Sequence, residues 1–172
     1  MRAIVIFESM FGNTEEVARA IADGLAAHLP ADAVDVFEVG AAPTSVAQKD
    51  LLVIGGPTHA FSMSRESTRE DAATKTTSPL VSQGEGVREW LERLTVPPGG
   101  HPAVAAFDTK VSRPRLPGSA AKAIERRLRK MGFTIVHPAT TFHVHGMEGP
   151  VEEGELEKAR QFGARLASGL TG

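Results

Sequence analysis

The sequence contains no cysteine and no tyrosine, and it has a single tryptophan among its 172 residues. The lack of cysteine excludes disulfides, thiolate metal sites and a cysteine nucleophile. No apolar run is long enough to span a bilayer, and the first residues lack the basic, apolar and cleavage regions of a signal peptide. We therefore expect a soluble, cytoplasmic protein without a membrane partner.

The apolar residues predict an alternation of strands and helices along the whole chain. Apolar runs predict strands at residues 2–7, 34–39, 51–54, 103–107 and 133–144, the last interrupted near Pro138. Apolar residues at helical spacing predict helices at residues 15–29, 86–94, 117–131 and 152–170. This alternation predicts a five-stranded parallel sheet with helices on both faces, a three-layer α/β/α sandwich. The length and average apolar content fit a single domain over residues 1–172.

The charge is uneven along the chain, although the net charge is only −2. Between residues 110 and 130 a single acid, Glu125, stands among many bases, which are Lys110, Arg113, Arg115, Lys122, Arg126, Arg127, Arg129 and Lys130. A solvated helix face is the favoured interpretation, and a docking surface for an acidic partner or a phosphorylated substrate is the alternative. No aromatic side chains interleave with these bases, so no nucleic-acid partner is predicted.

A glycine-containing turn from Ser9 to Thr14 lies between the first strand and the first helix. The N–H groups that begin a helix have no partner within it, and the helix dipole favours negative charge there. Gly12 allows a ligand to approach the backbone closely, and the side chains of Ser9, Asn13 and Thr14 add hydrogen-bond donors. The turn therefore predicts a phosphate site, and the alternative is an ordinary helix cap by Asn13 or Thr14. The GxGxxG and GxxxxGK[ST] patterns are absent, which argues against those two nucleotide-binding designs.

This turn resembles the [ST]-x-[ST]-G-N-T phosphate loop of flavodoxins, which bind flavin mononucleotide (FMN). The resemblance makes its residues candidate FMN ligands: Ser9, Met10, Phe11, Gly12, Asn13 and Thr14. Phe11 departs from the family, which usually has a hydroxyl there, so more of the phosphate binding falls to backbone amides, Ser9 and Thr14. The resemblance also implies the strand order 2-1-3-4-5, in which ligands bind at the carboxyl ends of the strands.

Residues 55–61, which follow the third strand and begin with a turn at 55–57, resemble the flavodoxin loop that covers the inner face of the flavin ring. The candidate FMN ligands here are Pro57, Thr58, His59, Ala60 and Phe61. His59 stands where many flavodoxins have tryptophan and flavin-dependent quinone reductases of this fold have arginine. Since histidine can donate a hydrogen bond or carry a proton near neutral pH, we predict flavin contact, with a structural histidine as the alternative. Phe61 either neighbours the ring or fills the core.

The residues after the fourth strand resemble the flavodoxin loop that contacts the other face and the pyrimidine edge of the ring. The candidate FMN ligands here are Phe107, Asp108, Thr109 and Lys110. Flavodoxins commonly stack a tyrosine in this place, which the chain lacks, and Trp90 lies on a predicted helix where we expect it in the core. The sequence therefore predicts weaker flavin binding than in typical flavodoxins.

Two further features yield weaker expectations. Residues 62–83 show neither a helical nor a strand period, so we expect an irregular loop that begins at the edge of the ligand site. Its Arg65 and Arg69 either reach a ligand or partner or, as favoured, are simply exposed. His143 and His145 face the same side of a strand, but no third ligand is suitably spaced, so no metal site is predicted.

Three functions remain open at this point. The favoured one is an FMN-binding electron carrier that passes electrons between redox partner proteins, with the flavin supplying the chemistry and no catalytic side chain. The alternative is an FMN-dependent oxidoreductase that transfers a hydride from NAD(P)H to a quinone-type acceptor. The short length and the missing nicotinamide signature favour the carrier. A flavodoxin-like domain that acts by binding alone, without flavin, is the third.

Overall fold

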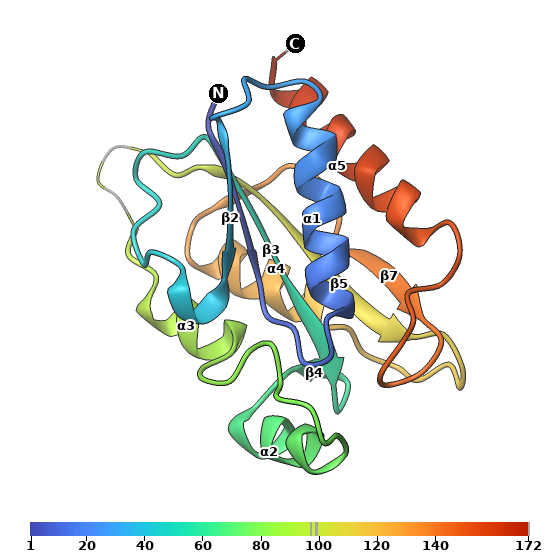
Figure 1. Cartoon of the computed structure of the whole chain (residues 1–172). Coiled ribbons are helices and arrows are strands. Elements are labelled where there is room, and N and C mark those ends of the chain that lie inside the picture. The colour runs from blue at the N-terminus through green and yellow to red at the C-terminus, as the bar shows by residue number, and fades with distance from the viewer. Residues whose placement is uncertain (97, 99, 172) are drawn as a thin grey trace.

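A parallel sheet between two layers of helices forms the centre of the protein (Figure 1). The computed structural model describes residues 1–96, 98 and 100–171. The strands are β1 (Ala3–Phe7), β2 (Val34–Glu38), β3 (Leu51–His59), β4 (Ser62–Met63), β5 (Ala103–Val111), β6 (Thr134–Ile135) and β7 (Thr140–Val144). The helices are α1 (Asn13–Ala26), α2 (Glu66–Thr74), α3 (Val87–Arg93), α4 (Ala120–Lys130) and α5 (Glu155–Thr171), with a 3-10 turn at Val39–Ala41.

The strand order follows the arrangement that the sequence predicted. The path is β2-β1-β3-β5-β6, and these strands pair in parallel. β7 also pairs in parallel with β5, further along than β6, so β6 and β7 together occupy the fifth position of the sheet. The predicted order 2-1-3-4-5 and the interruption of the last strand near Pro138 are therefore both confirmed.

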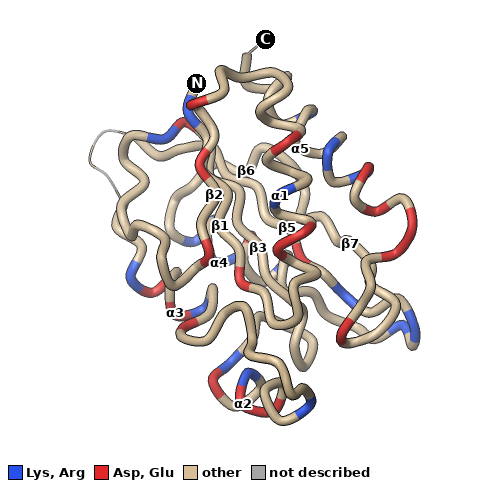
Figure 2. Tube along the Cα trace, in the orientation of Figure 1, with Lys and Arg blue, Asp and Glu red and all other residues tan. Residues whose placement is uncertain are grey.

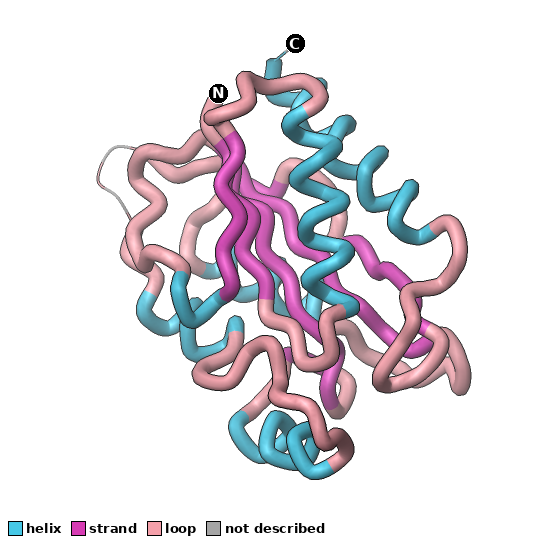
Figure 3. The backbone as a smooth tube through the Cα atoms, viewed as in Figure 1, coloured by secondary structure: helices cyan, strands magenta, loops and turns pink. Residues whose placement is uncertain are grey.

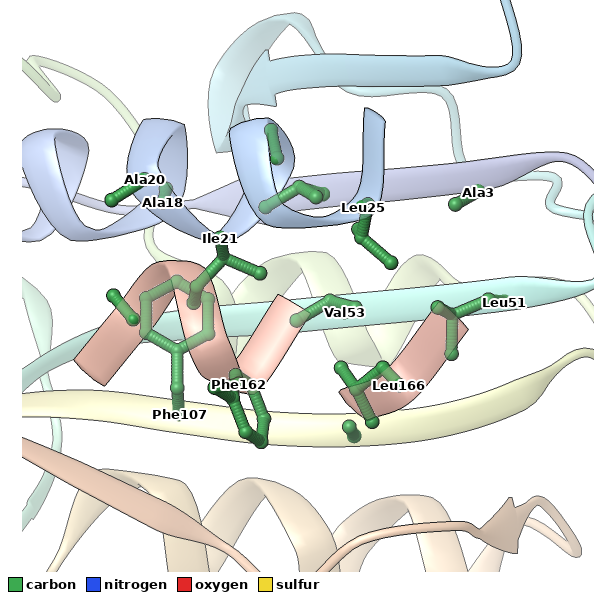
Figure 4. Packing of buried hydrophobic residues seen from close by; sticks show 14 of the residues in the cluster. Ala3, Ala18, Ala20, Ile21, Leu25, Leu51, Val53, Phe107, Phe162 and Leu166 are labelled. Carbon is green, nitrogen blue, oxygen red and sulfur yellow. The ribbon is translucent and has the colours of Figure 1, made fainter. Parts of the chain in front are cut away.

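Alternating side chains of the central strands build a core on each face of the sheet. On β1, Val5 and Phe7 pack toward α1 and α5, whereas Ile4 and Ile6 pack toward α3 and α4. Figure 3 shows the sheet between these helical layers, and Figure 4 shows side chains of α1 and α5 pointing toward β3 and β5. Trp90 is fully buried in the second cluster, as the sequence predicted.

Two strands continue beyond their predicted ends. β3 runs on to His59 and β5 runs on to Val111, so the predicted turn at 55–57 and the predicted loop after the fourth strand are wrong. The reason is that parallel pairing between the two strands extends as far as Pro57 and Thr109. The residues predicted to bind a ligand after the third and fourth strands therefore stand largely on rigid strand ends.

Residues 62–83 also differ from the prediction, because they contain β4 and α2. α2 buries only Arg69 and Ala72, so its sequence carries no apolar period that would identify a helix. It lies beyond the carboxyl ends of the strands, below the sheet in Figure 1. None of the helices in the described part of the chain has the length and apolarity that a membrane span requires.

Candidate functional site

A cavity of about 300 Å³ opens at the carboxyl ends of β1, β3 and β5. Residues from all three predicted loops line it, and these are Ser9, Met10, Phe11, Asn13, Thr14, Pro57, Thr58, His59, Ala60, Thr109 and Lys110. The parallel pairing of the three strands brings their carboxyl ends to one edge of the sheet, which places these distant segments side by side.

The start of α1 leaves backbone donors available at this cavity. Gly12 precedes the helix with a φ of 98°, and no side chain caps it, so the alternative of a cap by Asn13 or Thr14 is wrong. The Gly12 N–H donates to Ser9 Oγ at 3.1 Å. Within the described chain, the N–H groups of Asn13, Thr14 and Glu15 have no protein acceptor. Such a helix start favours an anion.

Hydrogen bonds hold this turn in place from two sides. The hydroxyls of Thr14 and Thr109 lie 2.7 Å apart and are both buried, which joins the turn to the end of β5. Ser82 donates its N–H to the Ser9 carbonyl at 2.7 Å, and its hydroxyl accepts from the Ser9 N–H at 3.0 Å. The Val81 N–H donates to the Met10 carbonyl at 3.0 Å. The turn is therefore fixed before any ligand arrives.

His59 forms part of the opposite wall of the cavity. Its Nδ1 lies 3.2 Å from Thr68 Oγ1, and that hydroxyl in turn donates to the Arg65 carbonyl. The Thr68 hydroxyl donates its proton to the Arg65 carbonyl, so it can only accept from His59. Nδ1 of His59 is therefore the donor in this contact, and Nε2 remains an acceptor. Burial lowers the pKa of His59, and the positive charge of Arg69 lowers it further. Burial and Arg69 therefore favour the neutral imidazole of His59 over the protonated form.

Sequence reasoning missed the part of the wall that α2 provides. The cavity is also lined by Thr68, Asp71, Ala72, Lys75, Val111, Val144 and Met147. Asp71 and Lys75 form an ion pair of 2.7 Å at the edge of this wall. The position of residues 62–83 directly after the third strand was the only sequence signal for this contact, since α2 has no apolar period.

The sequence matches the flavodoxin family over residues 5–89. The chain belongs to the flavodoxin family. Its fold also matches solved flavodoxins over its full length. An archaeal flavodoxin is 19% identical with a TM-score of 0.69, and each chain is covered completely. Oxidised flavodoxin 1 of Bacillus cereus is 20% identical with a TM-score of 0.71, and 98% of each chain is covered.

A larger protein contains the same fold as one part. The flavodiiron protein of Giardia intestinalis is 18% identical, with a TM-score of 0.60 over 99% of this chain and 36% of its own length. No curated protein sequence matches this flavodoxin-family chain significantly. At such identities the structural matches establish the fold, and the chemistry must be argued from the site.

Four predicted site residues of this flavodoxin-family chain do not line the cavity: Gly12, Phe61, Phe107 and Asp108. Gly12 shapes the turn instead. Phe107 is buried against Gly55, where an added Cβ would lie 2.6 Å from its ring. Phe61 neither fills the core nor lines the cavity, because it is 54% exposed.

Asp108 anchors α4 to the site rather than lining it. Its buried Oδ2 accepts from Ser119 Oγ at 2.6 Å, from Thr58 Oγ1 at 2.9 Å and from the Ala121 N–H at 3.0 Å. The Thr58 hydroxyl also accepts from the Ala120 N–H at 2.9 Å. These contacts satisfy the donors at the start of α4 and tie that helix to the cavity wall.

A buried polar cluster adjoins the turn at residues 9–14, and we call it the Glu8 cluster: Glu8, Ser64, Arg69 and Glu89. Glu8 is 1% exposed and accepts from Ser64 Oγ at 2.5 Å and from the Val87 N–H at 2.8 Å. Arg69 donates to Ser64 Oγ at 2.8 Å and pairs with Glu89. Burial raises the pKa of Glu8, although these hydrogen bonds and Arg69 act against the rise.

The Glu8 cluster corrects the expectation for the arginines of residues 62–83. Arg69 is only 8% exposed and lies in this cluster, so it is neither an exposed side chain nor part of the cavity. Arg65 is exposed, as favoured. His143 and His145 lie near glutamates, but within the described residues no three metal-binding side chains come together.

Proposed function

We propose that the cavity binds FMN and that the protein carries electrons between redox partner proteins. The observation that carries this proposal is the start of α1, where three successive backbone N–H groups have no acceptor among the described residues and the first two belong to residues that line the cavity. A phosphate dianion is the ligand that such a helix start favours. FMN, when bound, supplies the redox chemistry.

The side chains around the cavity fit the remainder of the cofactor. The N–H groups of Asn13, Thr14 and Glu15 would hold the phosphate, and Pro57 and Ala60 would border the ring. Nε2 of His59 offers an acceptor to a donor group of the ligand. These assignments use only groups that line the cavity or begin α1.

The cavity offers few aromatic surfaces for stacking. Its aromatic lining residues are Phe11 and His59, and neither is tyrosine or tryptophan. Because stacking against a large aromatic ring contributes to binding of flat ligands, we expect weaker FMN binding than a site with two such rings would give. The phosphate must then supply a larger share of the affinity.

A comparison of FMN with riboflavin tests the proposal. Riboflavin has the same ring without the phosphate, so it serves as a matched control ligand. We expect FMN to bind at least about 100-fold more tightly, measured by the quenching of flavin fluorescence. Equal affinity for FMN and riboflavin would contradict the proposal that the start of α1 binds the phosphate. A colourless protein that ignores both ligands would instead support the flavin-free binding domain.

Addition of NADPH without oxygen separates the carrier from the reductase. If the visible bands of bound FMN bleach with NADPH alone, the protein is an oxidoreductase. If they bleach only after a separate reductase is added, it is a carrier. The reductase remains an alternative because Asp71 and Lys75 also line the cavity, where a second ligand would find polar contacts.

A further inference from the structure

We propose that an acidic protein docks on the basic side of the cavity mouth. The docking surface, which we call the basic strip, begins at the mouth and continues along α4 away from it; its residues are Lys110, Arg113, Arg115, Lys122, Arg126, Arg127, Arg129 and Lys130. The inference rests on the proposed function in one respect, since a carrier needs its partner close to the cavity. Binding at the basic strip itself does not require FMN.

The first part of the basic strip lies at the mouth of the cavity. Lys110 lines the cavity and donates from Nζ to the carbonyls of Leu116 and Gly118, the latter at 2.7 Å. These bonds hold the loop 112–118, which carries Arg113 and Arg115, beside the cavity. Figure 2 shows basic residues on this loop after β5.

The same loop presents apolar side chains next to its charges. Leu116 is 50% exposed and Phe61 is 54% exposed. They belong to one surface, because Gly118 packs so closely on Phe61 that an added Cβ would lie 2.1 Å from its carbonyl oxygen. Exposed apolar side chains within a charged rim are typical of an interaction site and not of a solvated helix face.

The second part of the basic strip continues along α4. Lys122, Arg126 and Lys130 are exposed, and the distance along the helix from the first to the last is about 12 Å. In the described chain the ion pair formed within α4 joins Arg129 to Glu125. Asp108 and Thr58 fix the start of this helix to the cavity wall, so the strip and the cavity form one rigid unit.

An adjoining edge of the mouth carries the other charge. Ser112 begins the loop 112–118 and donates from its hydroxyl to Glu152, and Glu148 and Glu153 are exposed beyond β7, where Met147 lines the cavity. An acidic partner is attracted by Arg113, Arg115 and α4 and repelled by these glutamates. The boundary between the two charges therefore orients the partner at the mouth.

Binding of a purified acidic [2Fe–2S] ferredoxin tests this inference, measured by calorimetry at low and at physiological salt. The flavin-free and the FMN-treated chain are both titrated, with basic cytochrome c and a short DNA duplex as comparison probes. The test variant is Arg113→Glu with Arg115→Glu. The matched control is Arg160→Glu with Arg165→Glu, which makes the same change of charge on α5.

We expect the ferredoxin to bind in a salt-sensitive manner, and the Arg113/Arg115 variant to bind about tenfold more weakly while the α5 variant changes less than about twofold. Equal losses in both variants, or tighter binding of cytochrome c, would overturn the inference. Tighter binding of DNA at physiological salt would also overturn it, in favour of a nucleic-acid surface. If the protein binds ferredoxin but not FMN, the proposed carrier function alone is contradicted. If it binds FMN but not ferredoxin, the proposed docking surface alone is contradicted.

Discussion

The segments before and after Ser9 differ in whether their polar groups have hydrogen-bond partners within the protein. On one side, the Glu8 cluster is buried and each charged group meets a partner from another segment. On the other side, α1 begins with N–H groups that have no acceptor within the part of the chain that the structure describes. Buried polar groups normally pair within the protein. The side that leaves donors unpaired is therefore where a ligand is expected, and the side that pairs them holds the ligand site in shape.

Removal of Arg69 gives the largest expected effect. The change Arg69→Met leaves Glu8 and Ser64 buried without their cation, so we expect the free energy of unfolding to fall by about 3 kcal/mol. Urea unfolding measures this loss. Arg65→Met is the control, because Arg65 is exposed on the same segment and should change stability by less than about 0.5 kcal/mol. Equal effects would mean that Arg69 has no special role in the fold.

The contrast between the turn at residues 9–14 and the Glu8 cluster also explains what the sequence could and could not predict. The alternation of strands and helices, the turn at residues 9–14 and the buried Trp90 follow from local patterns, namely apolar runs and a short glycine motif, whereas the strand order follows from the resemblance to flavodoxins. α2 and the Glu8 cluster do not, because Arg69 becomes buried only through its partners on distant segments. The sequence shows that residue 69 is an arginine, but it does not show that the fold brings Ser64 and Glu89 into contact with Arg69.

A change in the turn itself should lower ligand affinity and stability together. Gly12 has a φ of 98°, and an added Cβ would meet nothing within 4 Å. The cost of Gly12→Ala is therefore backbone strain alone, and we expect a loss of about 1 kcal/mol in unfolding free energy. The control is Gly84→Ala, since Gly84 also has open space around it. If only Gly12→Ala weakens FMN relative to riboflavin, the turn holds the phosphate.

The raised pKa of Glu8 predicts a pH-dependent stability on the paired side. The folded protein keeps the Glu8 proton to a higher pH than the unfolded chain, whose carboxyl has the ordinary value of 4.5. The contribution of Glu8 to stability is therefore present below that value and is lost as pH rises through the folded pKa. Glu8→Gln cannot ionise, so its free energy of unfolding should rise relative to that of the unchanged protein as the pH rises. A difference in unfolding free energy that is the same at every pH would contradict the prediction.

His59, on the open side, should show a smaller dependence of the opposite sign. Its lowered pKa means that the unfolded chain takes up a proton first when the pH falls below the ordinary value of 6.5. Its contribution to stability is therefore present above that value and is lost as pH falls through the folded pKa. His59→Gln should flatten this slope, as urea unfolding between pH 5 and pH 7 would measure. Because burial favours the neutral imidazole in the folded protein, FMN affinity should not rise as the pH falls from 7. A rise in affinity upon acidification would instead mean that His59 binds the ligand as a cation.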